Sequence, residues 1–379
     1  MESESQKDKL ILEEFHVSEK TGFTVLDNLE KLPDYFQPWN DLADRIVELM
    51  ESKTVRKHID KLELLDHMKL SGEAELRLAH IQLCLFVSGY VWQDGPQDPA
   101  KKIPRCIAVP FHGVSQRLSL PPVMCYCNIT LWNWRPIDPE APLTLDNIRM
   151  FYLLPGGKES DNFLRSFIVL EVAFAPAIQR IMDAIYAVEA SDSASLTNCL
   201  ENVAAVIRNM TEMLNKYRDY IKPETFFNIL QVYFGGYGPN TPLPPGLVFE
   251  GVSDEPVYAN SCNAAETSTI HLLDAALGIK HSEGTREKFQ SFRQYMPAGH
   301  RRLIELVQQR SGIHQFVNNS GDKALSSAFE SCQKALADFR SFHIQLVTKY
   351  LVIPSKGSIP GVDEIMGFLK GLRNESTAK

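Results

Sequence analysis

The second half of the chain repeats apolar residues every three or four positions, over stretches too long to be strands. Residues 196–221 carry one such stripe, and residues 322–352 carry another. Steps of three and four return a side chain to the same face of an α-helix, so each stretch predicts a helix with one apolar face. The first stripe consists of Leu196, Leu200, Val203, Ile207, Met210, Leu214, Tyr217 and Ile221. This pattern predicts a mainly α fold.

Further segments show helical spacing. From Trp39 the apolar residues recur at helical steps, and residues 72–93 carry apolar groups on most faces, which predicts a buried helix. Pro223 suits the first turn of a helix, because its missing N–H would have no partner there. The helix that follows it covers residues 224–234, and others are expected at about 269–279, 285–295 and 298–310.

Proline, glycine and cysteine are frequent in the region of residues 94–147, between the early and the late predicted helices. Within it we expect short strands around residues 107–109 and 123–126. Residues 1 to about 33 resemble an extended polar arm, and residues 153–161 resemble a linker with one proline and two glycines.

The chain is long for a single hydrophobic core, at 379 residues. We therefore expect two domains, a small N-terminal domain over residues 1–154 and a large helical domain over residues 155–379.

Charge and cysteine usage narrow the class of protein. A net charge of -8 disfavours a nucleic-acid binder, which needs clustered basic surface. The seven cysteines have no framework spacing, and the polar N-terminus lacks the apolar centre of a signal peptide, so reduced thiols in the cytoplasm are expected. No apolar stretch approaches the roughly 18 residues of a membrane span. Glu171 interrupts the best candidate, residues 167–170.

The sequence lacks the motifs of several common chemistries. The glycines of FGGYGPN do not lie between a predicted strand and a helix, and LLPGGKES lacks the spacing of a phosphate loop. The sequence contains no HExxH and no CxxC, and the pair Cys125 and Cys127 alone is a weak metal signal. A hydrolase triad is not marked by any nucleophile elbow.

The helix predicted over residues 322–352 carries a histidine in the middle of its apolar face. One interpretation is a core histidine bonded to a backbone carbonyl, which spacing alone favours. The other is a haem ligand, because haem iron takes a neutral imidazole. Arg340 lies one turn earlier on a neighbouring face, where it either pairs with a haem propionate or is solvated. The face consists of Phe329, Cys332, Leu336, Phe339, His343, Leu346 and Tyr350.

A resemblance decides between these interpretations. The stretch RSFHIQLVTKYLVIP (340–354) resembles the proximal segment of the indoleamine 2,3-dioxygenase family, whose histidine ligates haem iron. The resemblance implies a two-domain helical fold, with a non-covalent haem b held mainly by the large domain. Other stretches that resemble family landmarks are LPDYFQPWNDLA (32–43), IAVPF (107–111), LPPVMCY (120–126), FFNILQVYFGGYG (226–238), GLVFEG (246–251), LLDAALGI (272–279) and QYMPAGHRRLI (294–304).

Carried over position by position, the resemblance assigns a pocket. It makes His343 the iron ligand, Arg340 a propionate partner and Asp274 the acidic partner of that arginine. It assigns no catalytic residue, because the chemistry belongs to haem and O₂ while the protein supplies orientation. The other matching positions around the cofactor are Tyr126, Phe163, Phe167, Phe226, Phe227, Gln231, Cys262, Asn263 and Ala264.

The chain departs from the family pattern at four places in this pocket. Gln231 replaces the arginine that grips the substrate carboxylate, so one neutral amide stands in for a bidentate charged fork. Its loss is worth roughly 2–4 kcal/mol of substrate binding. Phe167 stands where the enzymes commonly carry a small serine. Residues 261–264 are bulkier than the family's small-residue loop, and residues 357–365 are short and apolar where a threonine-bearing loop closes over substrate.

Neutral drift could explain any one of these four changes, and a solvent-facing position could explain Gln231. Four changes in one pocket nevertheless indicate a weakened substrate site. The first hypothesis is therefore a reversible O₂ carrier like the family's molluscan myoglobins, which binds tryptophan weakly. The second is an active dioxygenase that converts tryptophan or another indole to N-formylkynurenine. The third, a haem-free scaffold, is opposed by the retention of His343, Arg340 and Asp274. A monomer or a homodimer is expected.

Overall fold

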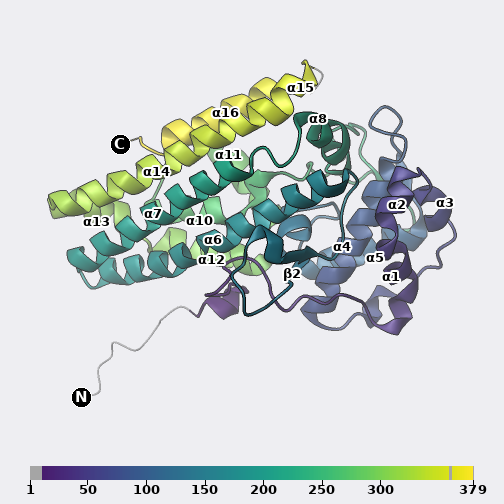
Figure 1. Cartoon of the computed structure of the whole chain (residues 1–379), viewed down its shortest axis with the longest axis horizontal. Helices are drawn as coiled ribbons and strands as arrows, with labels where there is room; N and C mark the ends of the chain where they lie inside the picture. The colour runs from purple at the N-terminus through teal and green to yellow at the C-terminus, as the bar shows by residue number, and fades with distance from the viewer. Residues whose placement is uncertain (1–10, 358–360, 379) are drawn as a thin grey trace.

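The computed structural model describes residues 11–357 and 361–378, and helices dominate it as the sequence predicts (Figure 1). The helices before residue 156 are α1 (Gln37–Asp44), α2 (Ile46–Glu51), α3 (Val55–Ile59), α4 (Gly72–Val91) and α5 (Arg105–Leu118). Those after it are α6 (Gly157–Glu189), α7 (Ser193–Tyr217), α8 (Pro223–Thr225), α9 (Gln231–Tyr233), α10 (Ser268–Leu277), α11 (Glu283–Ser291), α12 (Ala298–Arg310), α13 (Ile313–Ser320), α14 (Lys323–Val347), α15 (Ile353–Ser355) and α16 (Val362–Glu375).

Three short π-helical turns interrupt this pattern: η5 (Cys127–Leu131), η7 (Phe226–Leu230) and η10 (Thr348–Val352). Turns of this kind are rare and concentrate at functional sites. The turn η7 joins α8 to α9, and η10 continues α14. The turn η7 contains the phenylalanine pair, and η10 follows His343 within the stretch 340–354 that the sequence singles out. The 3-10 turns are η2 (Leu12–Phe15), η3 (Asp34–Phe36), η4 (His67–Lys69), η6 (Leu145–Asn147), η8 (Ala264–Glu266) and η9 (Phe292–Tyr295).

The long helices α6, α7 and α14 form the centre of the larger group of helices, with α7 packed between the other two (Figure 1). Both α7 and α14 begin at an aspartate whose side chain accepts two backbone N–H groups. Asp192 accepts from the amides of residues 194 and 195, and Asp322 accepts from those of residues 324 and 325. Such caps satisfy donors that the first helical turn leaves unpaired, so the sequence itself sets where these helices begin.

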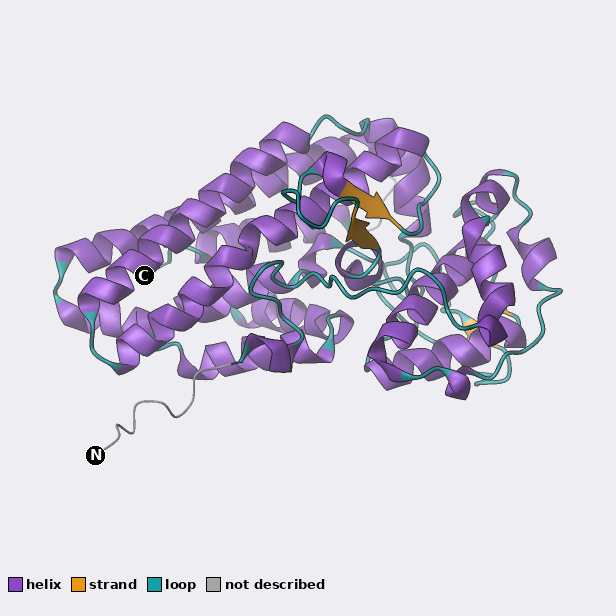
Figure 2. Ribbon diagram, turned by 60° about the horizontal axis from the view of Figure 1, so that its bottom comes forward, coloured by secondary structure: helices purple, strands orange, loops and turns teal. Residues whose placement is uncertain are grey.

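The strands are short and form two separate two-stranded sheets (Figure 2). The antiparallel pair joins β2 (Trp134–Pro136) to β3 (Ile148–Met150), which packs against α6. The parallel pair joins β1 (Lys102–Ile103) to β4 (Val248–Phe249), beside α4 and α5. Small β elements thus occur before residue 154 as predicted, although not at the predicted positions, and the fourth strand comes from the second half of the chain. The domain boundary at residue 154 stays a prediction.

Residues 11–33 are not the extended polar arm that the sequence suggested. Leu12, Val17 and Phe23 are buried within this segment. The Phe23 ring lies 4.7 Å from the His300 ring and 6.5 Å from the Phe174 ring, between centroids. A few apolar side chains among many charged ones are therefore enough to fasten the segment to α6 and α12. Residues 1–10 of the predicted arm lie outside the described residues.

The strands expected around residues 107–109 and 123–126 are wrong. Residues 105–118 form α5, whose buried Ile107, Phe111, Val114 and Leu118 follow one another at steps of four, three and four. That spacing is helical, and Pro110 inside the helix obscured it. Residues 123–126 run directly into η5.

The linker and the C-terminal loop are shorter than predicted. Helix α6 begins at Gly157, inside the proposed linker, and Gly156 before it has a φ of 112°, a conformation that favours glycine. Of the loop over residues 357–365, residues 358–360 lie outside the described residues and α16 begins at Val362. The sequence did not predict α3, α13 or α16. The helices expected from residues 72, 196, 298 and 322 are confirmed as α4, α7, α12 and α14. No helix among the described residues is long and apolar enough to span a membrane.

Candidate functional site

His343 is partly buried, and it differs from the fully buried histidines in its hydrogen bonding. His80 bonds Ser115 and Asn128, His271 bonds the Ala265 carbonyl, and His300 bonds Ser268. Buried polar groups are normally paired in this way. Over the described residues, by contrast, the imidazole of His343 has no hydrogen-bond partner. The interpretation of His343 as a core histidine bonded to a carbonyl is therefore wrong.

The electrostatic surroundings of His343 keep its ring neutral. Burial lowers the pKa of the imidazole to about 4, and the Arg340 guanidinium one turn away lowers it further. A neutral imidazole carries a lone pair on one ring nitrogen. A free neutral imidazole on an apolar helix face is the donor that a haem iron accepts from a protein.

A row of aromatic rings links α6 to the continuation of α14. The rings of Phe167 and Phe163 lie 4.9 Å apart between centroids, those of Phe163 and Phe226 lie 5.3 Å apart, and those of Phe226 and Tyr350 lie 5.9 Å apart. Phe163, Phe167, Phe226 and the neighbouring Phe227 are only partly buried, although they lie on helices that pack together. An apolar surface left uncovered between packed helices is typical of a binding site.

Tyr126 extends this row of rings and is itself held by a buried carboxyl group. Its ring lies 6.1 Å from that of Phe167, at an interplanar angle of 87°. Its hydroxyl donates to Glu171 Oε1 at 2.9 Å, and the hydroxyls of Thr267 and Thr269 donate to the same carboxyl at 2.5 and 2.7 Å. Burial raises the pKa of Glu171, although the three hydroxyls oppose the shift. The network fixes the Tyr126 ring beside Phe167.

Backbone and side-chain hydrogen bonds hold the loop over residues 261–264 in place. The Asn263 side chain caps η8 (Ala264–Glu266), and Glu266 reaches back to the Asn263 backbone N–H. Glu266 Oε2 also accepts the Tyr126 backbone N–H at 2.7 Å. The Cys262 N–H donates to the Phe234 carbonyl at 3.0 Å. The loop is thus tied both to Tyr126 and to the end of the helix that carries the phenylalanine pair.

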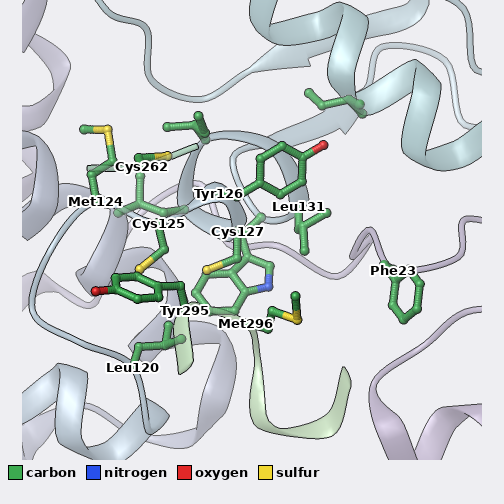
Figure 3. Close-up of a cluster of buried hydrophobic side chains, with 14 of the residues drawn as sticks. Phe23, Leu120, Met124, Cys125, Tyr126, Cys127, Leu131, Cys262, Tyr295 and Met296 are labelled. Atoms are coloured by element: carbon green, nitrogen blue, oxygen red, sulfur yellow. The ribbon is translucent and has the colours of Figure 1, made fainter. Parts of the chain in front are cut away.

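Three cysteine thiols lie close together at this loop. Figure 3 shows Cys125, Cys127 and Cys262 in one buried cluster beside Tyr126, with Tyr295 next to Cys125. All seven cysteines of the chain are free and buried. Burial raises the pKa of the Cys125 and Cys262 thiols well above the usual range, so both stay protonated. The cluster therefore acts as soft apolar packing behind the site.

The structure contains the expected pair of Arg340 and Asp274. Arg340 Nη2 donates to Asp274 Oδ2 at 2.6 Å, and both side chains are buried. The interpretation of Arg340 as a solvated residue is therefore wrong. Its Nη1 donates to the Leu372 carbonyl at 3.0 Å and to Ser376 Oγ at 2.6 Å, while its buried Nε has no partner among the residues that the structure describes. A role of Arg340 toward a haem propionate stays a prediction.

Gln231 is the first residue of α9, one turn beyond Phe227. Its side chain is partly buried and bonds none of the residues that the structure describes. It is therefore neither fully solvated nor locked into a network.

Several residues around the site were not predicted from the sequence. Thr267, Thr269 and His281 contact residues named in the sequence analysis, and Glu375 contacts His281. The contacts of Thr267, Thr269 and Glu375 join parts of the chain that are distant in sequence. No local signal marks such partners. The cap of Asn263 was accessible, because Asn263 and Glu266 have the spacing of a capping box.

Comparisons with known proteins agree with this geometry. The indoleamine 2,3-dioxygenase family model matches residues 11–377. The chain is 32% identical to human indoleamine 2,3-dioxygenase 2, over 97% of this chain and 95% of the relative. It is 36% identical to rat indoleamine 2,3-dioxygenase 1, over 93% of this chain and 88% of the relative. It is also 36% identical to the myoglobin of Haliotis madaka, over 96% of this chain and 97% of the relative. The chain belongs to the indoleamine 2,3-dioxygenase family.

Proposed function

We propose that this chain is a haem protein that binds O₂ reversibly and oxidises tryptophan weakly or not at all. The observation that carries the proposal is the position of Phe167. Its ring packs edge-on against Phe163 and Tyr126, at the place where the family's enzymes commonly carry a small serine. The similarity to a myoglobin of Haliotis madaka supports the same function.

The residues present fit a haem held through His343. The ring is neutral and has no hydrogen-bond partner among the described residues, so its lone pair is free to ligate the iron. Non-covalent haem b suits a chain without a CxxCH attachment site. When bound, the haem would supply an iron that can bind O₂ reversibly.

The phenylalanine rings and Gln231 determine which molecules can bind beside the haem. Phe163, Phe167 and Phe226 exclude water with a continuous row of rings. Phe167 also takes up space that an indole would need. Gln231 leaves a substrate carboxylate with one neutral amide, which binds a carboxylate more weakly than a bidentate guanidinium does. A small neutral ligand such as O₂ meets neither obstacle.

The second candidate function is an active dioxygenase acting on tryptophan or a related indole. The similarity to two indoleamine 2,3-dioxygenases favours it, as does the retention of Phe226 and Phe227. Under this proposal the protein orients substrate and excludes water, and no protein side chain serves as a base.

The deciding experiment measures O₂ binding and tryptophan turnover on the same reduced, haem-loaded protein. The carrier function predicts reversible changes of the haem absorption spectrum with O₂, and a spectrum that tryptophan barely perturbs. N-formylkynurenine is measured with tryptophan, a reductant and catalase present. Product formed at about one per second or faster would make the chain a dioxygenase.

The free thiols support a reducing compartment such as the cytoplasm, because oxidising compartments favour disulfides. We propose a monomer or a homodimer.

A further inference from the structure

His281 connects α16 to the ion pair that Asp274 forms with Arg340 of α14. Its Nε2 lies 3.0 Å from Asp274 Oδ2, and its Nδ1 lies 2.8 Å from Glu375 Oε2. The imidazole is 8% exposed. Glu375 is the last residue of α16 and also accepts the Ser282 backbone N–H at 3.1 Å. One side chain thus spans α10 and α16.

The same end of α16 is bound a second time by Arg340 of α14. The guanidinium donates to the Leu372 carbonyl and to Ser376 Oγ, and it also pairs with Asp274. His281 and Arg340 therefore hold α16 through a shared carboxylate. Since Arg340 lies one helical turn before His343, the position of this turn depends on both contacts.

The geometry around His281 requires a proton on each ring nitrogen. Each nitrogen faces a carboxylate oxygen, and a neutral imidazole donates from only one of them. Burial by itself lowers the pKa of His281, but Asp274 and Glu375 outweigh burial and raise it. Burial likewise raises the pKa of Asp274 and of Glu375, but their cationic partners outweigh it and lower both.

The charges that face His281 balance only while it is protonated. Asp274 from α10 and Glu375 from α16 carry two negative charges, and Arg340 from α14 with His281 carries two positive ones. From α11 the Phe289 ring faces His281, at 5.4 Å between centroids. His271 stacks on that same ring and stays neutral, because burial lowers its pKa to about 3. Deprotonation of His281 therefore leaves one uncompensated negative charge.

We propose that His281 is a positioning residue whose protonated form clamps α16 onto α14 and α10, and so holds in place the helical turn before His343. Its effect on haem retention rests on the proposed function, whereas the clamp itself does not. Because the pKa of folded His281 is raised, its contribution is full below the ordinary histidine pKa of about 6.5 and is lost as pH rises through the raised value.

The clamp is tested by hydrogen exchange in α16, corrected for the intrinsic pH dependence of exchange. From about pH 6 to pH 9, the wild-type protein should lose about tenfold protection in α16, equivalent to about 1.4 kcal/mol. Protection of α7 serves as the internal reference. His281→Gln should show low protection in α16 at every pH, because its amide does not titrate. His16→Gln is the matched control, because His16 pairs with Glu73 at the surface and should leave the wild-type profile unchanged.

The consequence for the site is tested by the rate of haem transfer to an excess of apomyoglobin. The wild-type rate should rise about threefold to tenfold over the same pH range, and His281→Gln should show a fast rate that does not vary with pH. Glu375→Gln keeps His281 and should shift the step to lower pH. Unchanged α16 protection across the range, or a wild-type profile in His281→Gln, would overturn the clamp. Haem release that ignores pH while α16 responds would overturn only the positioning role. A wild-type chain that holds no haem would refute the proposed function and leave the exchange result standing.

Discussion

Phe167 stands edge-on to Phe163, with 4.9 Å between ring centroids and 76° between ring planes. Such a contact is favourable for aromatic pairs and restrains both rings. On its other side Phe167 meets Tyr126, whose hydroxyl is fixed by Glu171. The phenyl ring therefore cannot swing aside without breaking contacts on two sides. This relationship supports the proposal that the chain binds an indole weakly.

Phe167→Ser combined with Gln231→Arg should strengthen tryptophan binding by at least about tenfold, or roughly 1.4 kcal/mol. Phe167→Ser provides space and Gln231→Arg provides a charged fork for the carboxylate, so neither alone should recover much. Binding is measured by tryptophan titration of the haem spectrum. Asn228→Arg adds a charge to an exposed position of the same helix and should change nothing. Equal gains from Asn228→Arg would show that general electrostatic attraction, and not a carboxylate clamp, is responsible.

His343→Ala should abolish the haem absorption band, because it removes the one imidazole of the pocket that lacks a hydrogen-bond partner among the described residues. Added imidazole should restore part of the band by ligating iron in the space left by the side chain. The measurement is the haem content per chain after desalting, together with the ligand spectrum. A variant that keeps its haem and an unchanged proximal spectrum would exclude His343 as the ligand.

Arg340→Ala and Asp274→Ala should each accelerate haem loss. In the double variant the acceleration should be smaller than the sum of the two single effects, because the two residues form one network. Removing one partner of a buried ion pair strands the other charge, which typically costs about 3–5 kcal/mol of stability. The pair of Lys334 and Asp338 is the matched control, because it lies on the exposed face of the same helix. Its disruption should change stability by less than about 1 kcal/mol. Simple additivity for Arg340 and Asp274 would show that they are not coupled.

Glu171→Gln should make the chain less sensitive to pH. Burial raises the pKa of Glu171, so folding favours its protonated form, and its stability contribution is full below the unfolded pKa of about 4.3 and is lost as pH rises through the folded value. Across that window the wild-type protein should lose stability relative to Glu171→Gln by at most about 1.4 kcal/mol per pH unit. Denaturant titrations at several pH values measure the difference. Parallel stability curves would mean that Glu171 ionises equally in both states.

Gly236→Ala should displace the loop over residues 259–263, because a Cβ there would lie 2.4 Å from the Ala259 carbonyl oxygen and the Ser261 nitrogen. Backbone atoms cannot yield as a flexible side chain does, so we expect a loss of about 1–3 kcal/mol and faster haem release. Gly284→Ala is the control, because a Cβ there would meet nothing within 4 Å and the residue lies in helix α11. It should be neutral or slightly stabilising. Equal effects of the two substitutions would exclude the crowding at Gly236 as the cause.

The periodic helices show what local sequence determines in this protein. Apolar residues at steps of three and four predict α7 and α14 without any knowledge of their neighbours, and the structure adds Asp192 and Asp322 as their local caps. Both signals act within a few residues, so they are already present in the unfolded chain. The position of His343 on the apolar face follows from the same periodicity.

Tertiary structure decided what the sequence left open. Whether His343 is bonded or free depends on residues that are distant in the chain. The three hydroxyls that bond Glu171 and the Glu375 carboxylate that faces His281 also come from distant segments. The buried segment around Phe23 and the helix through Pro110 were missed because packing outweighs local polarity and local helix breakers. Periodicity specifies which face of a helix is buried. The partner that packs on that face is determined by the free energy of packing and pairing across the whole chain, and a short stretch of sequence does not contain that information.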